Sequence, residues 1–322
     1  MQQPTSTEAA ENIVIVGAGI AGLATALGLH RQGIRSVVLE SSPTLRAAGF
    51  AFTTWTNAWR ALDALGVGDT IRAHHLRGQR LVVKSASSGE TTTKLSLMAQ
   101  GRSGMHEIYC VKRNFLLETL EKELPRGTIR YSSKIVSIEE DGNIKLLHLA
   151  DGSIIRTKVL IGCDGVNSIV AKWLGLKKPS FSGRSATRVL QSSQMAMGFN
   201  LNFCSSLARD FAQVYCLVQS KVYTGSSHGL LRPMKRSRRR LPPDDPDLGQ
   251  GGCSALEDSI VLARCLGEPI RGEDKEAKGE YERIKDGLKK YAENRRWRGI
   301  QLIVTAYIIG FIQQSDNAFI GF

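Results

Sequence analysis

Blocks of residues that predict strands alternate with blocks that predict helices along the first part of the chain. The apolar run at 13–16 (IVIV) predicts a buried strand, and the alanine- and leucine-rich stretch after residue 22 predicts a helix that ends at Gly33. A second apolar run at 37–40 (VVLE) predicts the next strand and ends in an acid. Strands that alternate with helices in this way predict a parallel sheet and the α/β class.

The middle of the chain continues with a helix and several strands. Residues 109–124 (YCVKRNFLLETLEKEL) predict a short strand and then a helix with a leucine stripe. The runs between 129 and 157 are separated by Asp-Gly and Gly-Asn turn signals and predict antiparallel strands. The apolar run at 159–163 predicts a buried parallel strand that ends at Asp164. An acid in that position faces the crevice where doubly wound sheets bind ligands.

The regular pattern is lost after about residue 190. One run near 214–218 predicts a strand, but the residues around it lack alternation and turn signals. Directly before the Asp-Asp-Pro that ends at Pro246 stands a basic stretch with two prolines (RRRLPP), and proline removes the donors that a central strand needs. We therefore expect an irregular segment at 191–245.

A glycine loop and a helix follow Pro246. The loop at 249–252 precedes SALED, in which Ser254 and Glu257 have the spacing of a capping box. This pattern predicts a helix that begins near Ser254 and leaves backbone N–H groups free at its start.

Charge and cysteine content narrow the classes of function. The formal net charge is +13, but much of the excess is concentrated at 232–240 and 289–298, so the charge does not predict a specific nucleic-acid surface. The segment at 232–240 also resembles a nuclear-localisation signal, although a disordered insert is the preferred interpretation. The six cysteines are scattered without a CxxC pair, which favours reduced thiols and no metal site.

Neither export nor membrane spanning is predicted. The N-terminal MQQPTSTEAAEN has no basic start and no apolar stretch, so we expect a cytoplasmic protein. The apolar run at 300–312 is shorter than the ~18 residues that a spanning helix needs. It predicts a C-terminal helix that packs on the protein, and peripheral contact with a membrane stays open.

Residues 17–22 (GAGIAG) give the clearest chemical signal. Gly17 permits a tight turn out of the strand, Gly19 lets the backbone approach a pyrophosphate, and Gly22 allows close packing of helix on strand. Glu40 lies 18 residues beyond Gly22 and is placed to accept hydrogen bonds from a ribose. Together they predict a dinucleotide site, with NAD and FAD both open.

Four motifs in order resemble the flavoprotein monooxygenases of the para-hydroxybenzoate and salicylate hydroxylase type, namely GAGIAG with Glu40, CVKRNFLLETL, LIGCDGVNS and PDLGQGGCSALED. Within that group the chain is most similar to the plant monooxygenases related to zeaxanthin epoxidase. The resemblance covers about residues 12–190 and 246–298. It implies an α/β fold with a Rossmann-like FAD-binding domain (a parallel sheet plus antiparallel strands) and an incomplete substrate-binding β-sheet region.

The resemblance also implies FAD as cofactor, NADH or NADPH as reductant, and an organic substrate that is hydroxylated or epoxidised with oxygen. The cofactor supplies the chemistry of such enzymes, and the protein positions it and excludes water. The residues that match the family's cofactor positions are Gly17, Gly19, Gly22, Glu40, Arg46, Arg113, Asp164, Gly165, Gly249, Gln250 and Gly251. No catalytic side chain is assigned.

The chain departs from the family before Pro246, because the Gly-Asp pair that precedes the glycine loop in the family is absent. A shortened or frame-altered segment between about 190 and 245 is our interpretation, and a flavin-binding remnant without turnover is the alternative to an active enzyme. An NAD-dependent dehydrogenase is disfavoured, because it would leave the GQG loop unexplained. We predict a disordered tail at 1–11, the first part of the FAD-binding domain at 12–190, a remnant of the substrate domain at 191–245, the rest of the FAD-binding domain at 246–300, and a C-terminal helix or tail at 301–322.

Overall fold

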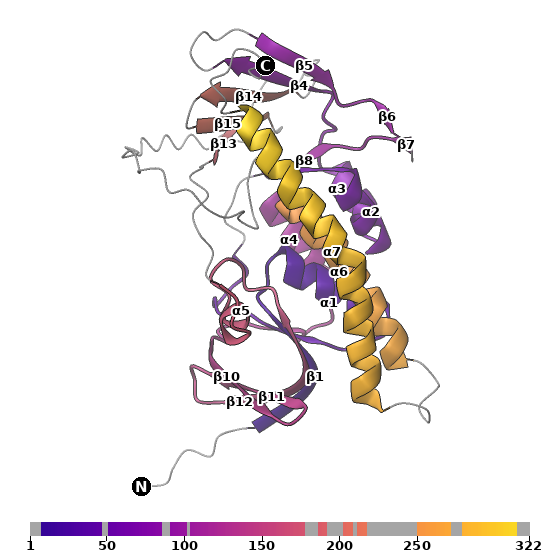
Figure 1. Ribbon diagram of the computed structural model, residues 1–322, viewed down its shortest axis with the longest axis vertical. Helices are drawn as coiled ribbons and strands as arrows, with labels where there is room; N and C mark the ends of the chain where they lie inside the picture. The colour runs from indigo at the N-terminus through magenta and orange to yellow at the C-terminus, as the bar shows by residue number, and fades with distance from the viewer. Residues whose placement is uncertain are drawn as a thin grey trace.

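Two main sheets and a layer of helices make up the part of the chain that the computed structural model describes, which is residues 8–46, 51–85, 91–101, 104–177, 186–191, 202–208, 211–217, 250–271 and 279–313 (Figure 1). The helices are α1 (Ile20–Arg31), α2 (Thr56–Ala64), α3 (Gly68–Ala73), α4 (Arg113–Lys122), α5 (Ile169–Trp173), α6 (Gly251–Arg271) and α7 (Glu280–Gln313). The strands are β1 (Glu8–Val16), β2 (Val37–Leu39), β3 (Ala51–Thr54), β4 (Arg80–Ser85), β5 (Thr91–Ser96), β6 (Gln100–Gly101), β7 (Gly104–Met105), β8 (Tyr109–Lys112), β9 (Ile129–Arg130), β10 (Ile135–Asp141), β11 (Ile144–Leu149), β12 (Ile154–Gly162), β13 (Ala186–Gln191), β14 (Asn202–Ala208) and β15 (Phe211–Leu217).

The larger sheet has six strands in the order β10-β11-β12-β1-β2-β9. The strands β12, β1, β2 and β9 run parallel to one another, and β10 and β11 extend the sheet in antiparallel fashion. This confirms the predicted α/β class with a parallel sheet plus antiparallel strands. It also confirms the strand–helix–strand unit at the start of the chain.

Residues 13–16 of β1 are buried from both faces of the sheet, which explains the apolar run IVIV. Ile13 and Ile15 point into the core beneath α1, α2, α4 and α6, whereas Val14 and Val16 join the cluster on the other face beside α5. The strand begins at Glu8, so the predicted tail at 1–11 is too long, and residues 1–7 lie outside the described part.

Strand β12 replaces two predicted strands. The sequence predicted an antiparallel strand that ended near Thr157 and a separate parallel strand at 159–163. The structure has one continuous strand that is antiparallel to β11 and parallel to β1. Thr157 is buried at the junction, where its hydroxyl donates to the carbonyls of Asn12 (3.2 Å) and Val159 (2.9 Å) and makes a polar residue acceptable inside the sheet.

Small residues let α1 and α6 pack closely, although they are more than 200 residues apart in sequence. A Cβ on Gly28 would lie 3.0 Å from the Cβ of Ala263. Beside this contact the hydroxyl of Thr25 donates to the hydroxyl of Ser259 at 3.0 Å, and both side chains are buried. These contacts fix α6 over the first helix of the fold.

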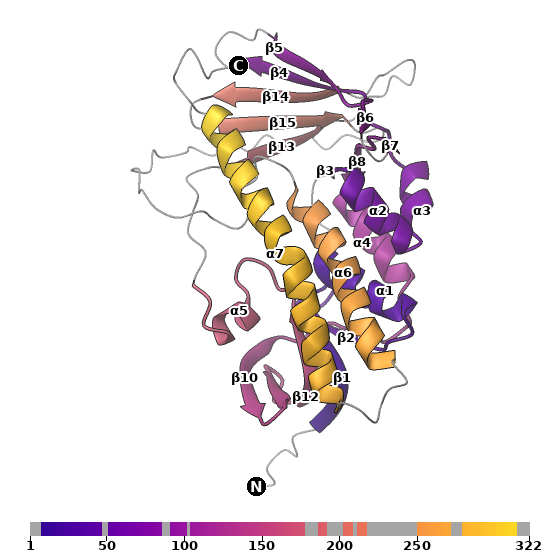
Figure 2. The same cartoon turned by 45° about the vertical axis from the view of Figure 1, so that its right-hand side comes forward.

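Helix α7 is a single helix of 34 residues that passes through the predicted boundary at residue 300. It extends from beside β1 and β12 to the second sheet (Figure 2). Its contact with α6 is close at Gly287, where a Cβ would lie 2.5 Å from the carbonyl oxygen of Cys265. In the part of the chain that the structure describes, no helix combines the length and apolar character needed to cross a membrane.

The second sheet has five strands in the order β13-β15-β14-β4-β5. It joins strands from the first hundred residues to strands after residue 185. Within the predicted irregular segment, β15 matches the run near 214–218, and β14 is an additional strand that pairs with both β15 and β4.

The cysteines that the structure describes differ in state. Cys163, Cys253 and Cys265 are free thiols, and burial raises the pKa of Cys163 to about 12 and that of Cys253 to about 11. Cys110 is disulfide-bonded, so the expectation of reduced thiols is wrong at this residue.

Candidate functional site

The turn between β1 and α1 is built from glycines that other residues could not replace in the same way. Gly17 has φ = 99°, and its N–H donates to the carbonyl of Leu39 at 2.7 Å. A Cβ on Gly22 would lie only 1.9 Å from the carbonyl oxygen of Gly17. In contrast, no described heavy atom lies within 4 Å of a Cβ built on Gly19. Thus Gly22 serves packing, and Gly19 borders open space.

The N-terminus of α1 faces that open space without a side-chain cap. The first N–H groups of a helix have no partner within the helix, and together with the helix dipole they favour an anion. The N–H of Ala18, directly before Gly19, is the exception, since it donates to Glu40 Oε2 at 2.9 Å. The remaining amides at this end are placed to bind a phosphate.

Glu40 directly follows β2 and is only 5% exposed. Burial by itself would raise the pKa of its carboxyl, but the N–H groups of Ala18 and Ser42 and the guanidinium of Arg46 outweigh burial and lower that pKa. The Ser42 N–H and Arg46 Nη2 both donate to Oε1, at 2.8 and 2.9 Å. Oε2 accepts one bond, from Ala18, so it retains capacity for a further donor.

Arg46 and Arg113 lie together beside Glu40. Arg113 is the first residue of α4, as predicted, and its Nη1 donates to the carbonyl of Arg46 at 2.9 Å. The Arg46 side chain is 69% exposed and pairs with the carboxylate of Glu40. The three predicted residues therefore form one connected group at the end of β2.

Asp164 follows β12 at the same edge of the sheet. The Cys163 N–H donates to the carbonyl of Val16 at 2.8 Å, and the Cys163 carbonyl oxygen would touch a Cβ on Gly17, so Asp164 lies beside the glycine turn. Its Oδ2 accepts from the N–H of Ile169 at 2.7 Å. Its Oδ1 is buried and has no hydrogen-bond partner among the described residues. The next residue, Gly165, has φ = 78°, which a larger residue would adopt only with strain.

The helix after the glycine loop begins earlier than predicted. Helix α6 starts at Gly251, and the Ser254 N–H donates to the carbonyl of Gln250 at 2.7 Å, so Ser254 already lies within the helix. The predicted capping box is therefore wrong. Gly252 lies in the first turn of α6. Glycine is required at this position, because a Cβ there would lie 2.9 Å from the ring of Phe52. Gly249 lies outside the described residues.

Gln250 stands directly before α6, and its side-chain Oε1 is buried without a partner among the described residues. The Ser259 hydroxyl, two turns into α6, donates to the carbonyl of Ala21 in the first turn of α1 at 3.1 Å. Gly251 is eight residues before Ser259, which corresponds to about 12 Å of helix. The two helix N-termini thus lie on one side of the molecule at a separation that a dinucleotide can bridge.

Several residues around the start of α6 had not been predicted. The Trp55 N–H donates to Cys253 Sγ at 3.4 Å, and the buried indole Nε1 of Trp55 has no acceptor among the described residues. Asn57 Nδ2 donates to Glu257 Oε2 at 3.0 Å, and Arg295 of α7 binds the other oxygen of Glu257. No local pattern marks Trp55 or Asn57, because both act through residues about 200 positions away.

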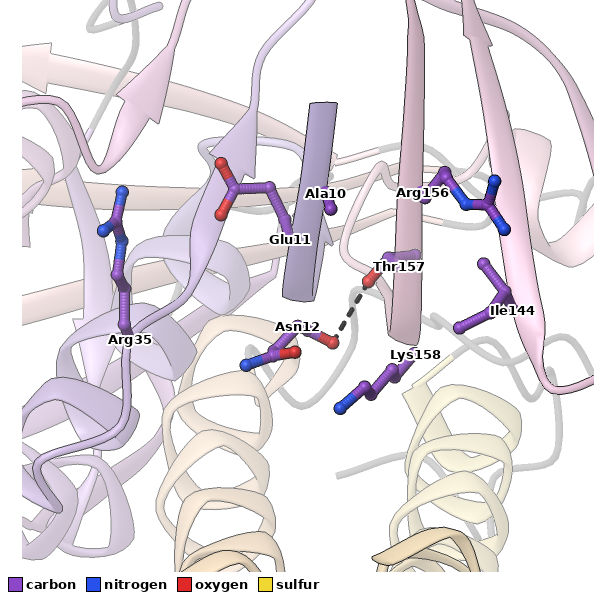
Figure 3. A pocket seen from close by; sticks show the side chains of 8 residues that line it. All are labelled: Ala10, Glu11, Asn12, Arg35, Ile144, Arg156, Thr157 and Lys158. Carbon is purple, nitrogen blue, oxygen red and sulfur yellow. Dashed lines mark hydrogen bonds between the residues drawn. The ribbon is translucent and has the colours of Figure 1, made fainter. Parts of the chain in front are cut away.

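A cavity of about 370 Å³ lies elsewhere, on the N-terminal part of β1 (Figure 3). Arg35 and Arg156 lie on opposite sides of β1 and β12 in this view, and Glu11 and Lys158 are in ion pairs with residues outside the cavity lining. The charges are therefore paired or divergent, and we assign no ligand to this cavity. It is lined by Ala10, Glu11, Asn12, Arg35, Ile144, Arg156, Thr157 and Lys158.

A dinucleotide fits the residues at the C-terminal edge of the larger sheet. The glycine turn leaves room for a pyrophosphate at Gly19, and the buried oxygens of Asp164 and Gln250 have no donor among the residues that the structure describes. A buried acceptor without a partner is costly, so a bound group that supplies donors would relieve that cost.

Comparison with known proteins identifies the dinucleotide. The model of the FAD binding domain family matches residues 10–241, which is more than two thirds of the chain. The chain belongs to this family. Monooxygenase 2 of Arabidopsis thaliana is 43% identical over 373 aligned positions, which cover 96% of this chain and 91% of that protein. 3-Hydroxybenzoate 6-hydroxylase 1 of Aquipseudomonas alcaligenes is 31% identical over 66% of this chain and 56% of its own length. The chain is thus an FAD-dependent monooxygenase by family, with FAD as cofactor.

Two solved structures illustrate the shared fold. 2,6-Dihydroxypyridine-3-hydroxylase from Arthrobacter nicotinovorans aligns with a TM-score of 0.71 at 16% identity, over 96% of this chain and 94% of that one. HpxO of Klebsiella pneumoniae, solved with FAD and uric acid, aligns with a TM-score of 0.67 at 17% identity, over 96% of this chain and 90% of that one.

Proposed function

We propose that this FAD-dependent monooxygenase uses NADH or NADPH and oxygen to hydroxylate or epoxidise an organic substrate, either aromatic or isoprenoid. The observation that carries the proposal is the combination of an open glycine turn at Gly19 with two buried oxygens, of Asp164 and Gln250, that no described residue of the chain hydrogen-bonds. The similarity to 3-hydroxybenzoate 6-hydroxylase 1 favours an aromatic substrate. The isoprenoid alternative rests on the resemblance to plant monooxygenases related to zeaxanthin epoxidase.

Each proposed cofactor residue has a physical role. Gly17, Gly19 and Gly22 shape the turn so that the amides of α1 face the pyrophosphate, and the free capacity of Glu40 Oε2 is available to a ribose hydroxyl. Arg46 anchors Glu40 and brings positive charge to the same end. The further residues proposed to hold the cofactor are Arg113, Asp164, Gly165, Gly249, Gln250 and Gly251.

Bound FAD would supply the redox chemistry of the reaction. The chain's own residues bind and orient it. The N-terminus of α6 would present its positive potential to the electron-rich end of a bound flavin ring. Phe52 packs against the first turn of α6 at Gly252. The contacts of α6 with α1 hold the two helix N-termini, which would bind the two ends of the cofactor, at a fixed separation.

A remnant that binds FAD without turnover is the second candidate. The alignment with Monooxygenase 2 spans 373 positions, whereas this chain has 322 residues, so at least 51 positions of that alignment lack a residue of this chain. Together with the missing Gly-Asp pair before Pro246, this supports a shortened or frame-altered segment between about 190 and 245. The coding DNA tests that part, because Gly-Asp-Ala codons in an offset frame are expected there.

The charged and exposed side chains of α7 bear on the partners and the location that we propose. Arg295, Arg298 and Lys290 in the basic run of α7 all pair with acids of α6, which supports the absence of a nucleic-acid partner. The exposed side chains of Trp297 and Ile300 on the same helix are available for peripheral membrane contact. A cytoplasmic location remains our proposal.

The decisive experiment measures flavin and turnover separately. The purified chain is expected to show the visible spectrum of flavin at one equivalent per chain, and to oxidise NADH or NADPH faster when an aromatic substrate is added. Flavin without any stimulated oxidation across a substrate panel would support the remnant. A colourless chain that does not take up added FAD would refute both candidates.

A further inference from the structure

Arg295 of α7 binds two acids in the second turn of α6. Arg295 Nη1 donates to Glu257 Oε1 at 2.6 Å, and its Nε donates to Asp258 Oδ1. The Arg295 side chain is only 12% exposed, so both bonds are shielded from water. Arg298 adds a weaker contact to Glu257 at 3.5 Å.

The two acids lie near the start of α6. Glu257 and Asp258 are six and seven residues after Gly251, which places them about 9–11 Å along the helix from its N-terminus. Glu257 is held from a third element as well, because Asn57 of α2 donates to its Oε2. The cluster therefore ties α2, α6 and α7 together behind the proposed flavin end of the site.

The charges of this cluster act on whatever binds at Gly251. A helix N-terminus favours electron density, but two carboxylates in the second turn oppose that preference. The burial of Glu257 would raise its pKa, yet Arg295 and Asn57 lower it, so this acid carries its charge at neutral pH. Arg295 is the cation that offsets both acids.

We propose that Arg295 is a positioning residue for the flavin: it fixes the N-terminus of α6 and offsets part of the negative charge of Glu257 and Asp258, so that the helix stabilises the reduced flavin. The proposal rests on the proposed binding of the flavin ring at the start of α6. It assigns Arg295 no contact with the cofactor. Nearby negative charge disfavours addition of electrons, so loss of Arg295 is expected to lower the midpoint potential of the bound flavin.

The test compares variants of the full-length chain loaded with FAD. The measurements are the FAD dissociation constant from flavin fluorescence and the midpoint potential from equilibration with a reference dye. Arg295→Met is expected to weaken FAD binding at least tenfold and to make the potential more negative, and Arg295→Lys is expected to restore most of the potential. The triple variant with Glu257→Gln and Asp258→Asn added to Arg295→Met removes one positive and two negative charges, so its potential should recover to at least that of the unchanged chain.

A matched control comes from the same pair of helices. Lys290 of α7 pairs with Glu268 of α6 at 2.6 Å, and Glu268 is 17 residues, about 25 Å, beyond Gly251. Lys290→Met removes an interhelical ion pair without changing charge near the flavin, so its potential should not move. If Arg295→Met behaves like Lys290→Met in affinity and potential, the proposal is overturned.

Two further variants keep the outcome interpretable. Asp258→Asn leaves the bond of Arg295 to Glu257 and should make the potential more positive, so a wild-type potential in this variant contradicts the proposal even if Arg295→Met does not fold. Gly19→Ala tests the proposed site on its own. If Gly19→Ala weakens FAD binding while Arg295→Met does not, the cofactor site stands and only the role of Arg295 fails. If Gly19→Ala binds FAD normally, the proposed site itself fails.

Discussion

Replacement by alanine is expected to lower the stability of the protein at Gly22 and its affinity for FAD at Gly19. The two variants therefore distinguish a packing role from a contact with the cofactor. A Cβ at Gly22 would lie 1.9 Å from the carbonyl oxygen of Gly17, more than 1 Å inside the closest approach that such atoms make. Because the obstacle is backbone, no rotamer change relieves it. We take about 3 kcal/mol for the overlap and subtract about 1 kcal/mol that alanine gains over glycine in a helix. The net loss in the free energy of unfolding is about 2 kcal/mol.

Gly19→Ala should leave the apoprotein nearly unchanged. No described atom lies within 4 Å of its Cβ, and φ is −79°, which any residue adopts. As the residue that flanks the start of α1, it costs at most about 1 kcal/mol on replacement by alanine. The Cβ would, however, occupy the space of the pyrophosphate. Loss of one charge-assisted hydrogen bond, about 1.5–3 kcal/mol, corresponds to about a 10- to 100-fold weaker dissociation constant for FAD.

Urea unfolding of the apoproteins, followed by circular dichroism, measures the first effect, and titration with FAD, followed by flavin fluorescence, measures the second. Gly22→Ala should lose stability whether or not FAD is present. Gly19→Ala should lose affinity at nearly constant apoprotein stability. Wild-type affinity in Gly19→Ala would refute the contact between this backbone and the pyrophosphate, and wild-type stability in Gly22→Ala would refute the packing argument.

Three further predictions concern the stability and reactivity of the fold. The folded protein lowers the pKa of Glu40, so the ionised carboxylate stabilises the fold above its unfolded pKa, and this stabilisation is lost as pH falls through the folded pKa. Glu40→Gln should therefore lose about 1–3 kcal/mol in the free energy of unfolding at pH 7. Urea titrations of this variant should also show a shallower loss of stability between about pH 5 and 3. Gly287→Ala should be destabilised by about 1–3 kcal/mol, because its Cβ would meet α6. Gly299→Ala, whose Cβ has no described atom within 4 Å, should gain up to about 1 kcal/mol. Thermal unfolding compares the two variants, and equal stability would contradict the close helix contact. Cys253 and Cys163, whose pKa values burial raises, should resist iodoacetamide at pH 8 until the chain unfolds, as peptide mass spectrometry can check.

Local patterns predicted the elements whose physics is local. The strand IVIV is buried on both faces, and the glycine turn obeys short-range sterics, so both could be recognised from a few neighbouring residues. Strand β12 was divided in two because Lys158 and the polar Thr157 interrupt its apolar pattern. The carbonyls of Asn12 in the neighbouring strand β1 and of Val159 accept from the Thr157 hydroxyl, which makes that polar residue compatible with a continuous strand.

Long-range contacts explain what the sequence missed at the site. Ser254 and Glu257 have the spacing of a capping box, but Glu257 binds Asn57 and Arg295 instead, and the helix has already begun at Gly251. The sequence pattern shows the spacing of Ser254 and Glu257, but it does not show that Asn57 and Arg295 bind Glu257 in the folded protein. The unpaired oxygens of Asp164 and Gln250 could be detected only with coordinates, although both residues had been selected by motif.

The arrangement of contacts separates cofactor binding from turnover. Helix α6 is held to α1 through Thr25 and Ser259, and to α7 through Arg295, and none of these contacts passes through residues 191–245. The glycine turn and Asp164 depend on β1, β2 and β12, which pair with one another and with strands before residue 178. An altered middle segment would therefore leave most of the FAD-binding framework intact while changing the part of the chain expected to recognise substrate. For this reason bound flavin alone would not establish an active monooxygenase, and substrate-stimulated oxidation of NADH or NADPH is the measurement that distinguishes the enzyme from the remnant.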